Sequence, residues 1–286
     1  MSEPAPTLDS LGAGIQPPGS DAEGHAEKTL ADAEVSEARH GRLARLARWW
    51  VTTAGTGAGP ASVVQLWGTP ASGAGDGAIR VLPPAVPETV DAAIAWGAAA
   101  VDDVVDGGAD LLLCCAPARI AAKVLAAHLV DMDAIEALGW PGQSGLDDQV
   151  WSAEVVAVRD GLRRTAGVRG DPAGLLHALG SPTMAAACAA LLQAAARRTP
   201  VILDGLGAAA AGLLARRVER PVQAWWQVGS VADGDALTGR VLTGLALKPL
   251  LQLDLRIEDG TGARLALAVL HEATALLSGL GRAADG

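Results

Sequence analysis

The sequence predicts an α/β fold of the Rossmann-like three-layer kind, in which helices cover both faces of a mainly parallel sheet. Two observations predict it. From Pro87 onward, short apolar runs of strand length alternate with longer helical segments, which is typical of a parallel sheet. The apolar runs are also nearly continuous instead of alternating with polar residues. Such runs indicate strands that are buried on both faces.

Each expected element carries its own local signal. The segment that begins at Pro87 has Pro and Glu in its first turn and Gly after its end, and "SPTMAAACAALL" opens with a Ser cap followed by Pro, as helices do. "ADLLLCCA" and "TPVILDG" are apolar runs of strand length. In chain order we expect helices at about 39–50, 87–108, 119–129, 150–164, 181–198, 208–218, 235–244 and 263–280, and strands at about 61–68, 109–116, 199–205, 222–229 and just before 256.

The first part of the chain differs in composition from the rest. Residues 1–36 are rich in Pro, Gly, Ser, Glu and Asp and have little periodic apolar content, so we expect them to be mostly disordered or loosely attached. Residues 37–286 then form the α/β domain. A chain of 286 residues and 28.8 kDa is long enough to bury a sizeable core and to enclose an active site.

Charge and cysteine content exclude several classes of function. The formal net charge is -10 and the pI is near 4.9, whereas proteins that bind nucleic acid or anionic membranes carry clustered basic charge. Cys114, Cys115 and Cys188 have neither zinc-site nor redox-motif spacing. The chain starts without a basic-then-apolar leader, and no apolar run reaches the roughly 18 residues that a membrane span requires. We therefore expect a cytoplasmic protein that binds neither nucleic acid nor membrane.

The segment "RIEDGTG", residues 256–262, is the first candidate for chemistry because it joins a strand region to a strongly helical run. In an open α/β sheet, ligands bind beyond the carboxyl ends of the strands, and "LDG", residues 203–205, follows a strand in the same way. Glycines let the backbone approach a ligand, and amides at a helix start favour an anion. A carboxylate there is a candidate base. In the alternative interpretation, Asp259 only caps the helix and Glu258 is solvated.

Other motifs give weaker evidence for a functional site. "DDVVD", residues 102–106, has the spacing of carboxylates that share Mg²⁺ in prenyl-diphosphate enzymes, but that chemistry belongs to an all-helical fold, and a solvated helix face is the simpler interpretation. "GTGAGP", residues 55–60, is typical of a flexible connection. The five His are scattered without metal-ligand spacing.

Two long motifs in the C-terminal half carry a resemblance to a known family. "RRTPVILDGLGAAAAGLLA" is similar to a strand and helix with the pattern P-V-[IL]-L-D-G, and "ALKPLLQLDLRIEDGTGARLAL" resembles L-x-P-L-L-x-L-x-M-R-L-G-E-G-[ST]-G-A-x-L-A. Both patterns belong to the nicotinate-nucleotide:dimethylbenzimidazole phosphoribosyltransferases, which assemble the lower nucleotide of cobalamin. The match runs in order over residues 171–280. Weaker similarity includes "GQSGLDDQVW", which resembles the family's G-[RT]-G-T-G-[LV]-D-D.

The resemblance implies a mechanism and a set of site residues. A glutamate of the R-L-G-E-G motif takes the proton from the benzimidazole while the other ring nitrogen attacks C1 of the ribose and nicotinate leaves with inversion. Alignment on the arginine and the glycines implies that Asp259 is this base. It also implies a small helical subdomain built from the termini, a homodimer, and no metal or other cofactor. The expected substrate-binding residues are Arg256, Glu258, Gly260, Thr261, Gly262, Asp204, Gly205, Gly142 and Gly145.

Several family segments are altered in this chain. The family's glycine-rich G-E-M-G-I-G-N-T-T loop is replaced by "CCAPARIAA", residues 114–122, so the backbone cannot approach a phosphate as closely there; Arg119 or Lys123 can supply charge instead. Glu154 stands where the family has a lysine, and a carboxylate repels phosphate. Because "ILDG" and "RIEDGTGA" keep the base, the arginine and the glycine turn together, we expect phosphoribosyl transfer from nicotinate mononucleotide to 5,6-dimethylbenzimidazole or a related base. The alternatives are a weak or inactive paralogue that binds a nucleotide or base, or regulates an active partner, and an unrelated α/β enzyme.

Overall fold

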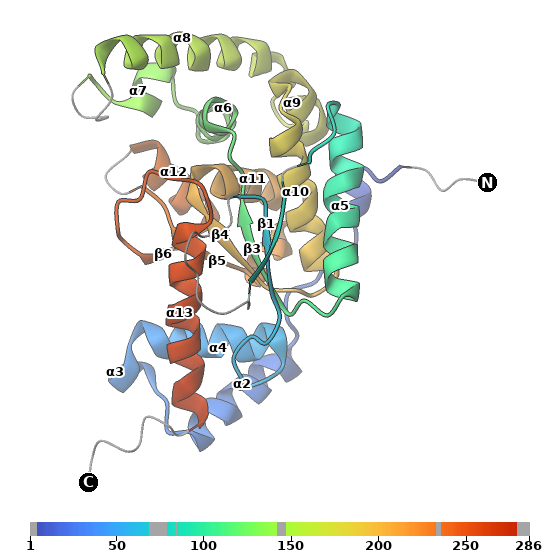
Figure 1. Ribbon diagram of the computed structural model, residues 1–286, viewed down its shortest axis with the longest axis vertical. Coiled ribbons are helices and arrows are strands. Elements are labelled where there is room, and N and C mark those ends of the chain that lie inside the picture. Colours follow the sequence, from blue (N-terminus) through green and yellow to red (C-terminus); the bar gives the residue numbers. More distant parts are fainter. Residues whose placement is uncertain (1–4, 69–78, 84, 142–146, 233–235, 279–286) are drawn as a thin grey trace.

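A computed structural model describes residues 5–68, 79–83, 85–141, 147–232 and 236–278. Its centre is a six-stranded sheet with the order β2-β1-β3-β4-β5-β6, in which every neighbouring pair is parallel. The strands are β1 (Val63–Leu66), β2 (Ile79–Leu82), β3 (Leu111–Cys115), β4 (Val201–Asp204), β5 (Trp226–Ser230) and β6 (Pro249–Leu251). The predicted parallel sheet is confirmed, and Figure 1 shows helices on both sides of it.

The two faces of the sheet belong to two separate cores. Leu112 and Cys114 pack into a large core with the helices on one face, whereas Leu111 and Leu113 pack into a second core on the other face. This alternation follows from the two-residue period of a strand. The first face carries α5 (Val90–Asp106), α6 (Arg119–Val130), α10 (Pro182–Ala196) and α11 (Gly205–Val218), and the second carries α4 (Arg42–Ala54) and α13 (Thr261–Ala275).

The remaining helices extend the domain at its two ends (Figure 1). At one end, α6 packs against α8 (Asp148–Thr165), with α7 (Ala134–Leu138), α9 (Pro172–Leu179) and α12 (Ala236–Leu245) around it. At the other end, α2 (Ser20–Asp32), α3 (Glu37–His40) and α4 form a small helical subdomain with α13. Short 3-10 turns are η1 (Ala166–Val168), η2 (Arg220–Trp225) and η3 (Leu276–Ser278).

The N-terminal segment differs from the expectation of disorder. Residues 5–36 include α1 (Leu8–Gly12) and α2, and α1 starts with a capping box between Thr7 and Ser10. Leu8 and Leu30 are 1% and 3% exposed. The few apolar residues of this segment therefore pack against the rest of the chain, with α1 against α10 and α2 against α4. The average composition of a segment does not reveal a few isolated apolar residues that pack into the core.

Three smaller differences concern the strands. β2 was not expected, because its four residues adjoin a glycine-rich stretch and are only half buried. The expected strand at 222–229 begins only at Trp226, because residues 220–225 form the turn η2. β6 has only three residues, and the chain then runs without regular structure to residue 258.

Among the described residues, no helix is long and apolar enough to cross a membrane.

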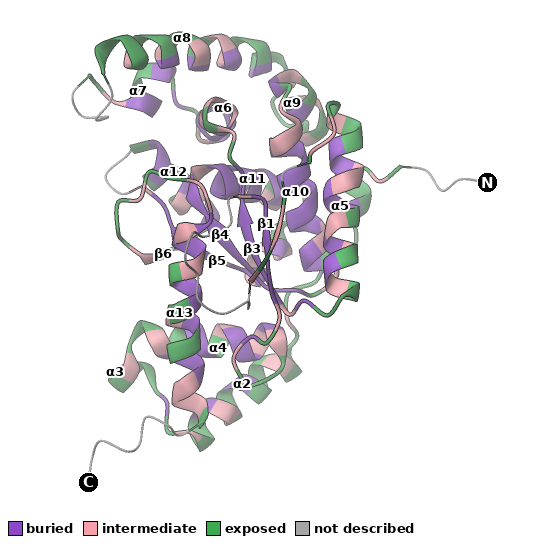
Figure 2. Cartoon of the chain, viewed as in Figure 1, coloured by how far each residue is buried: buried purple, intermediate pink, exposed green. Residues whose placement is uncertain are grey.

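The helices on the first face approach each other closely because they carry small side chains. α10 is buried along almost its whole length, as Figure 2 shows by its purple ribbon. A Cβ atom on Gly97 of α5 would lie 2.4 Å from the carbonyl oxygen of Ala186 in α10, so backbone would meet side chain. This close approach accounts for the small side chains, mostly Ala, along α10, because larger ones there would force α5 and α10 apart.

The same change, glycine to alanine, should therefore have opposite effects on stability at two positions. Gly97→Ala should destabilise the protein by about 1–3 kcal/mol, because the added methyl overpacks the α5–α10 contact. Gly24→Ala should stabilise it by about 0.5–1 kcal/mol, because Gly24 is exposed within α2 with nothing near its Cβ position and Ala favours a helix. Urea unfolding measures both. Equal midpoints for the two variants would contradict the packing of α5 and the folded state of α2.

Candidate active site

The turn between β6 and α13 lies over the carboxyl end of the sheet. The Gln65 side chain of β1 donates to the carbonyl oxygen of Asp259 at 3.2 Å, and the Gly260 amide donates to the carboxylate of Asp204 at the end of β4. A Cβ atom on Gly262 would lie 2.2 Å from Asp204 Oδ1. Residues 204 and 258–262, which are far apart in the sequence, therefore meet at the edge where parallel α/β sheets bind ligands.

Asp259 is positioned by the first turn of α13. Its Oδ1 accepts the Thr261 amide at 2.9 Å and its Oδ2 lies 4.0 Å from the Arg264 guanidinium, while its side chain is 35% exposed. Partial burial alone would raise the pKa of Asp259, but hydrogen bonds from Thr261 and the positive charge of Arg264 hold this pKa below its usual range. The carboxylate thus accepts an amide of the first turn of α13, stays ionised at neutral pH and remains partly exposed.

Glu258 points to a different helix and is partly buried. Its Oε1 accepts the Gly207 amide at 3.1 Å, and the Leu206 amide contributes a second hydrogen bond. Both amides belong to the first turn of α11, whose dipole favours negative charge. Burial raises the pKa of Glu258 overall, although the two amides and the positive charge of Lys123 act in the opposite direction. The chain thus places its own anion on the N-terminus of α11.

Asp204 is the most enclosed acid of the site. It is 2% exposed, and burial, reinforced by the negative charges of Asp259 and Glu258 and opposed by the Gly260 amide and Arg264, raises its pKa to about 7. Its Oδ2 and the hydroxyl of the register neighbour Ser230 are buried without a hydrogen-bond partner among the described residues. Gly205 follows with a φ of 76°, and a Cβ atom there would lie 2.7 Å from Glu258 Cγ.

Gln65 and Arg264 complete the support of the turn, and sequence reasoning missed both. Arg264 donates to Gln65 Oε1 and to Thr261 Oγ1, each at 2.7 Å. Gly260 has a φ of 92°, and a Cβ atom there would lie 2.4 Å from the Gln65 side chain, so only glycine fits. One signal pointed to Gln65: it is the only polar residue of the apolar strand "VVQL", and a fully buried amide needs partners.

A pair of tryptophans borders this network. Trp67 follows β1 in a left-handed conformation with a φ of 56°, and its carbonyl accepts hydrogen bonds from Gln65 and Cys115. The Trp67 ring stacks on Trp96 of α5 with centroids 5.7 Å apart. The end of β1 is thereby fixed by one stacking contact and two hydrogen bonds.

The sequence also predicted Arg256, Gly142 and Gly145 as contacts of the substrate. Arg256 is 54% exposed at its side chain and lies 3.9 Å from Asp254, on the irregular segment before the turn. Gly142 and Gly145 lie outside the described residues. Within the described part of the chain, no group of three or more His, Cys, Asp or Glu side chains could hold a metal ion.

The altered loop after β3 brings charges of its own. Glu154 of α8 is 3% exposed, and its Oε2 lies 2.6 Å from Lys123 Nζ, while Arg119 contacts its other oxygen. A buried carboxylate needs such partners. The sequence suggested that Glu154 would repel a phosphate, but the structure shows that two cations of α6 compensate it.

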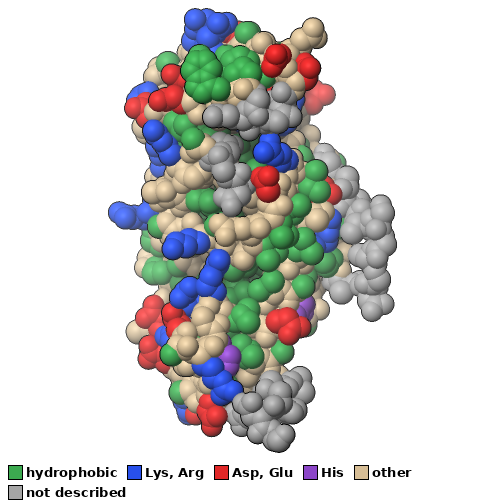
Figure 3. Space-filling model, turned by 90° about the vertical axis from the view of Figure 1, so that its left-hand side faces the viewer, with side chains coloured by type: hydrophobic (Ala, Val, Ile, Leu, Met, Phe, Trp, Pro, Cys, Tyr) green, Lys and Arg blue, Asp and Glu red, His purple; other side chains and the backbone are tan. Residues whose placement is uncertain are grey.

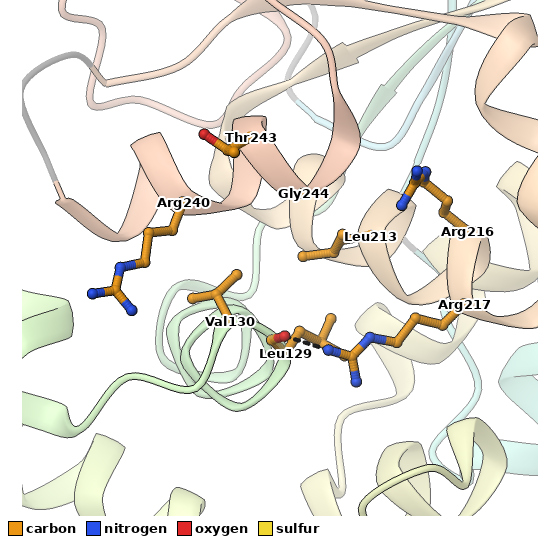
Figure 4. Close-up of a pocket in the computed structure, with 8 residues that line it drawn as sticks. All are labelled: Leu129, Val130, Leu213, Arg216, Arg217, Arg240, Thr243 and Gly244. Atoms are coloured by element: carbon orange, nitrogen blue, oxygen red, sulfur yellow. Dashed lines mark hydrogen bonds between the residues drawn. The ribbon is translucent and has the colours of Figure 1, made fainter.

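A separate hollow of about 430 Å³ lies between the C-terminal ends of α6 and α11 and the helix α12 (Figure 4). Arg217 donates to the carbonyl oxygen of Leu129 there, and Arg216 to the side chain of Gln223. Both arginines lie in the last turn of α11, whereas Asp204 and Glu258 lie at the first turn of this helix. The hollow therefore does not belong to the candidate site.

The chain is similar to known proteins over about two thirds or more of its length. The nicotinate-nucleotide–dimethylbenzimidazole phosphoribosyltransferase of Mycobacterium avium is 40% identical over 211 residues, which cover 72% of this chain and 59% of the relative. The enzyme of the same name from Mycobacterium tuberculosis is 40% identical over 192 residues, covering 66% and 52%. The chain thus spans little more than half the length of these relatives.

The fold is also similar to that of a solved structure. The crystal structure of nicotinate-nucleotide-dimethylbenzimidazole phosphoribosyltransferase from Thermus thermophilus superposes with a TM-score of 0.71 at 18% identity, covering 91% of this chain and 96% of that one. Residues 37–286, which hold the whole sheet and the turn at its carboxyl edge, match the family described as DBI_PRT phosphoribosyltransferase. By its sequence and by the fold that positions its acidic cluster, this chain belongs to that phosphoribosyltransferase family.

Proposed function

We propose that the chain transfers the phosphoribosyl group of nicotinate mononucleotide to 5,6-dimethylbenzimidazole or a related base, giving α-ribazole phosphate and nicotinate for cobalamin biosynthesis. Family membership and the names of the relatives support this reaction. The observation that carries it is the meeting of Asp259, Glu258 and Asp204 at the carboxyl edge of the sheet, where a base and an anion-binding helix start lie together.

In this proposal Asp259 is the general base. One benzimidazole nitrogen forms a bond to C1 of the ribose, the bond from C1 to the nicotinate nitrogen breaks, and its electron pair neutralises the pyridinium. The attacking ring becomes positively charged as the new bond forms, so the proton on its other nitrogen becomes acidic and passes to Asp259. An ionised carboxylate of low pKa is sufficient, because the proton is transferred from a cationic ring.

The remaining residues of the cluster have positioning roles in this proposal. Asp204 is largely uncharged below pH 7, so it accepts the Gly260 amide without repelling the two neighbouring carboxylates. Gly260, Thr261 and Gly262 hold the backbone of the turn against the substrate, and Gln65 fixes this turn to β1. Arg256 and Gly205, together with Gly142 and Gly145 in the segment outside the described residues, are further proposed contacts of the substrate.

The altered loop after β3 favours one alternative function. The loop at 116–118 lies against the first turn of α11, where a Cβ atom on Gly207 would be 2.1 Å from the carbonyl oxygen of Ala116. A carbonyl oxygen is an acceptor, so at this point the loop does not present an amide donor of the kind that a glycine-rich phosphate loop supplies. In the alternative, the chain binds a nucleotide or a base without turnover, or regulates an active partner.

We also infer that two copies of the chain associate. The described surface exposes large apolar side chains, four of them on or beside α7 and α8: Ile135, Trp140, Val150 and Val156. Figure 3 shows hydrophobic side chains at that end of the molecule. A homodimer would remove such residues from water.

Replacement of the base should abolish most of the turnover. Purified protein mixed with nicotinate mononucleotide and 5,6-dimethylbenzimidazole should release nicotinate, and Asp259→Asn should slow this release by about a hundredfold or more, as loss of a general base does. Asp103→Asn, on the exposed face of α5, is the matched control. Retained turnover in Asp259→Asn together with its loss in Glu258→Gln would assign the base to Glu258. Saturable binding without turnover in the unmodified chain would support the alternative function.

The raised pKa of Asp204 should make stability depend on pH in a defined window. The unfolded chain loses the Asp204 proton near pH 4 and the folded chain near pH 7, so this group costs stability as pH rises from about 4 to about 7. Asp204→Asn should remove this loss and become more stable than the unmodified protein, by up to about 4 kcal/mol at pH 7. Urea unfolding at pH 4.5, 6 and 7.5 measures the difference. A difference that does not change with pH would show that Asp204 is not buried as described.

The proposed association should be visible in the molar mass. Light scattering after size exclusion should give twice the mass of one chain, and Trp140→Asp should reduce it, because a carboxylate would be buried in the contact. A mass of one chain for the unmodified protein, at concentrations of about 10 μM or more, would contradict the homodimer.

A further inference from the structure

The starting observation is the hollow between the C-terminal ends of α6 and α11 and the helix α12. Its volume of about 430 Å³ lies within the range of small-molecule sites in proteins. Among the described residues that line it there is no acidic side chain, although the whole chain has a net charge of -10. The lining residues that decide its chemistry are Leu129, Val130, Leu213, Arg216, Arg217 and Arg240.

The three arginines of this hollow have no carboxylate partner in the described part of the chain. Arg217 donates to the carbonyl oxygen of Leu129 and Arg216 donates to the side-chain oxygen of Gln223, so both of these acceptors are uncharged. Arg240 is exposed and makes neither a hydrogen bond nor an ion pair with any described residue. The positive charge around the hollow is therefore not neutralised by these residues.

Most N–H donors of these arginines stay available to a ligand. A guanidinium group has five such donors. Arg216 uses its Nε for Gln223, and Arg217 uses one terminal nitrogen for Leu129, so both keep terminal N–H groups for a further acceptor. Burial and the positive charge of Arg169 lower the pKa of Arg217, and an anion beside this guanidinium would stabilise its charged form.

The dipoles of the helices do not account for all three arginines. Arg216 and Arg217 lie in the last turn of α11, where cations complement the negative end of a helix. Arg240 lies in the middle of α12, so it has no such role on its own helix. Figure 4 shows Arg240 on one side of Val130, whereas Arg216 and Arg217 extend from α11 on the other side. Positive charge therefore lies at both ends of the hollow, with apolar side chains between.

This arrangement fits a small organic dianion. We propose that the hollow binds a molecule that carries an anionic group, carboxylate or phosphate, at each end of an apolar body. Arg240 binds one group, and the terminal N–H groups of Arg216 and Arg217 bind the other through charge-assisted hydrogen bonds. The leucine and valine side chains of the lining contact the apolar body. Because the hollow is separate from the acidic cluster, this proposal does not depend on the proposed function.

Cations at both ends predict a preference for two anionic groups over one. Adipate carries two carboxylates on an aliphatic chain, and hexanoate has a chain of the same length with only one. The bisphosphate ester of hexanediol carries two phosphates instead. A comparison of these three probes separates the number of anionic groups from their kind.

Calorimetric titration of the full chain with the three probes at low salt tests this directly. At least one dianion should bind about tenfold to a hundredfold more tightly than hexanoate, the range for one additional charged hydrogen bond. Arg240→Gln should remove most of this difference. Arg164→Gln, on the exposed face of α8, removes the same charge outside the hollow and is the matched control. The dianion with the higher affinity then identifies the preferred anionic group as carboxylate or phosphate.

A second variant and a second measurement guard against misfolding. Arg240 is exposed and holds no described residue in place, so Arg240→Gln and Arg240→Glu should both unfold at the same urea concentration as the unmodified chain. Arg240→Glu reverses the charge and should abolish binding of the dianions. A saturating dianion should raise the unfolding midpoint of the unmodified chain, because a ligand stabilises the state that binds it, and should leave that of Arg240→Glu unchanged.

Other results would overturn the proposal. An unmodified chain that binds neither dianion at concentrations up to about 10 mM has no such site. Equal affinity for the dianions and hexanoate would show that the two ends do not act together. Dianion binding that is unchanged in Arg240→Gln, or that weakens equally in Arg240→Gln and Arg164→Gln, would show that the hollow is not where the dianion binds.

Discussion

The hydrogen bonds of the Gln65 side chain hold the candidate site together. This amide is fully buried in β1 and reaches three groups: the carbonyl oxygens of Trp67 and Asp259 and the guanidinium of Arg264. A buried amide is costly unless it is paired, so the position of the turn at 259–262 and the register of β1 depend on each other. The glycine at 260 is a consequence, because any side chain there would collide with Gln65.

Much of the fold could be predicted from local patterns. β3 and β4 are almost wholly apolar, and α10 has its Ser cap and following Pro where they were expected. α5 ends at the expected glycine but begins only at Val90, after a Thr89 cap, so the expected Pro and Glu lie before it. β2 is an edge strand with half-buried residues, and its pairing with β1 is decided by tertiary contacts. α1 and α2 were missed for the same reason: Leu8 and Leu30 are isolated in the sequence, and only their partners reveal them as core residues.

The candidate site was predictable in its position but not in its electrostatics. Strand ends and glycines located Asp204 and the turn, since these signals are local. The pairing of Lys123 with Glu154 joins residues on two helices, and the docking of Glu258 on Gly207 joins residues 51 positions apart. Such contacts carry no periodic signal. Glu154 was therefore interpreted as a repulsive charge when it is in fact the residue that fixes a cation.

The stacking of Trp67 on Trp96 makes the site optically visible. The chain has eight Trp and neither Tyr nor Phe, so its near-ultraviolet spectrum comes almost entirely from indole. Two rings stacked at 5.7 Å are close enough for their electronic transitions to couple, and one of them belongs to the residue whose carbonyl binds Gln65. A change in the turn over β1 is thus transmitted to a pair of chromophores, and circular dichroism can report on the site without an added label.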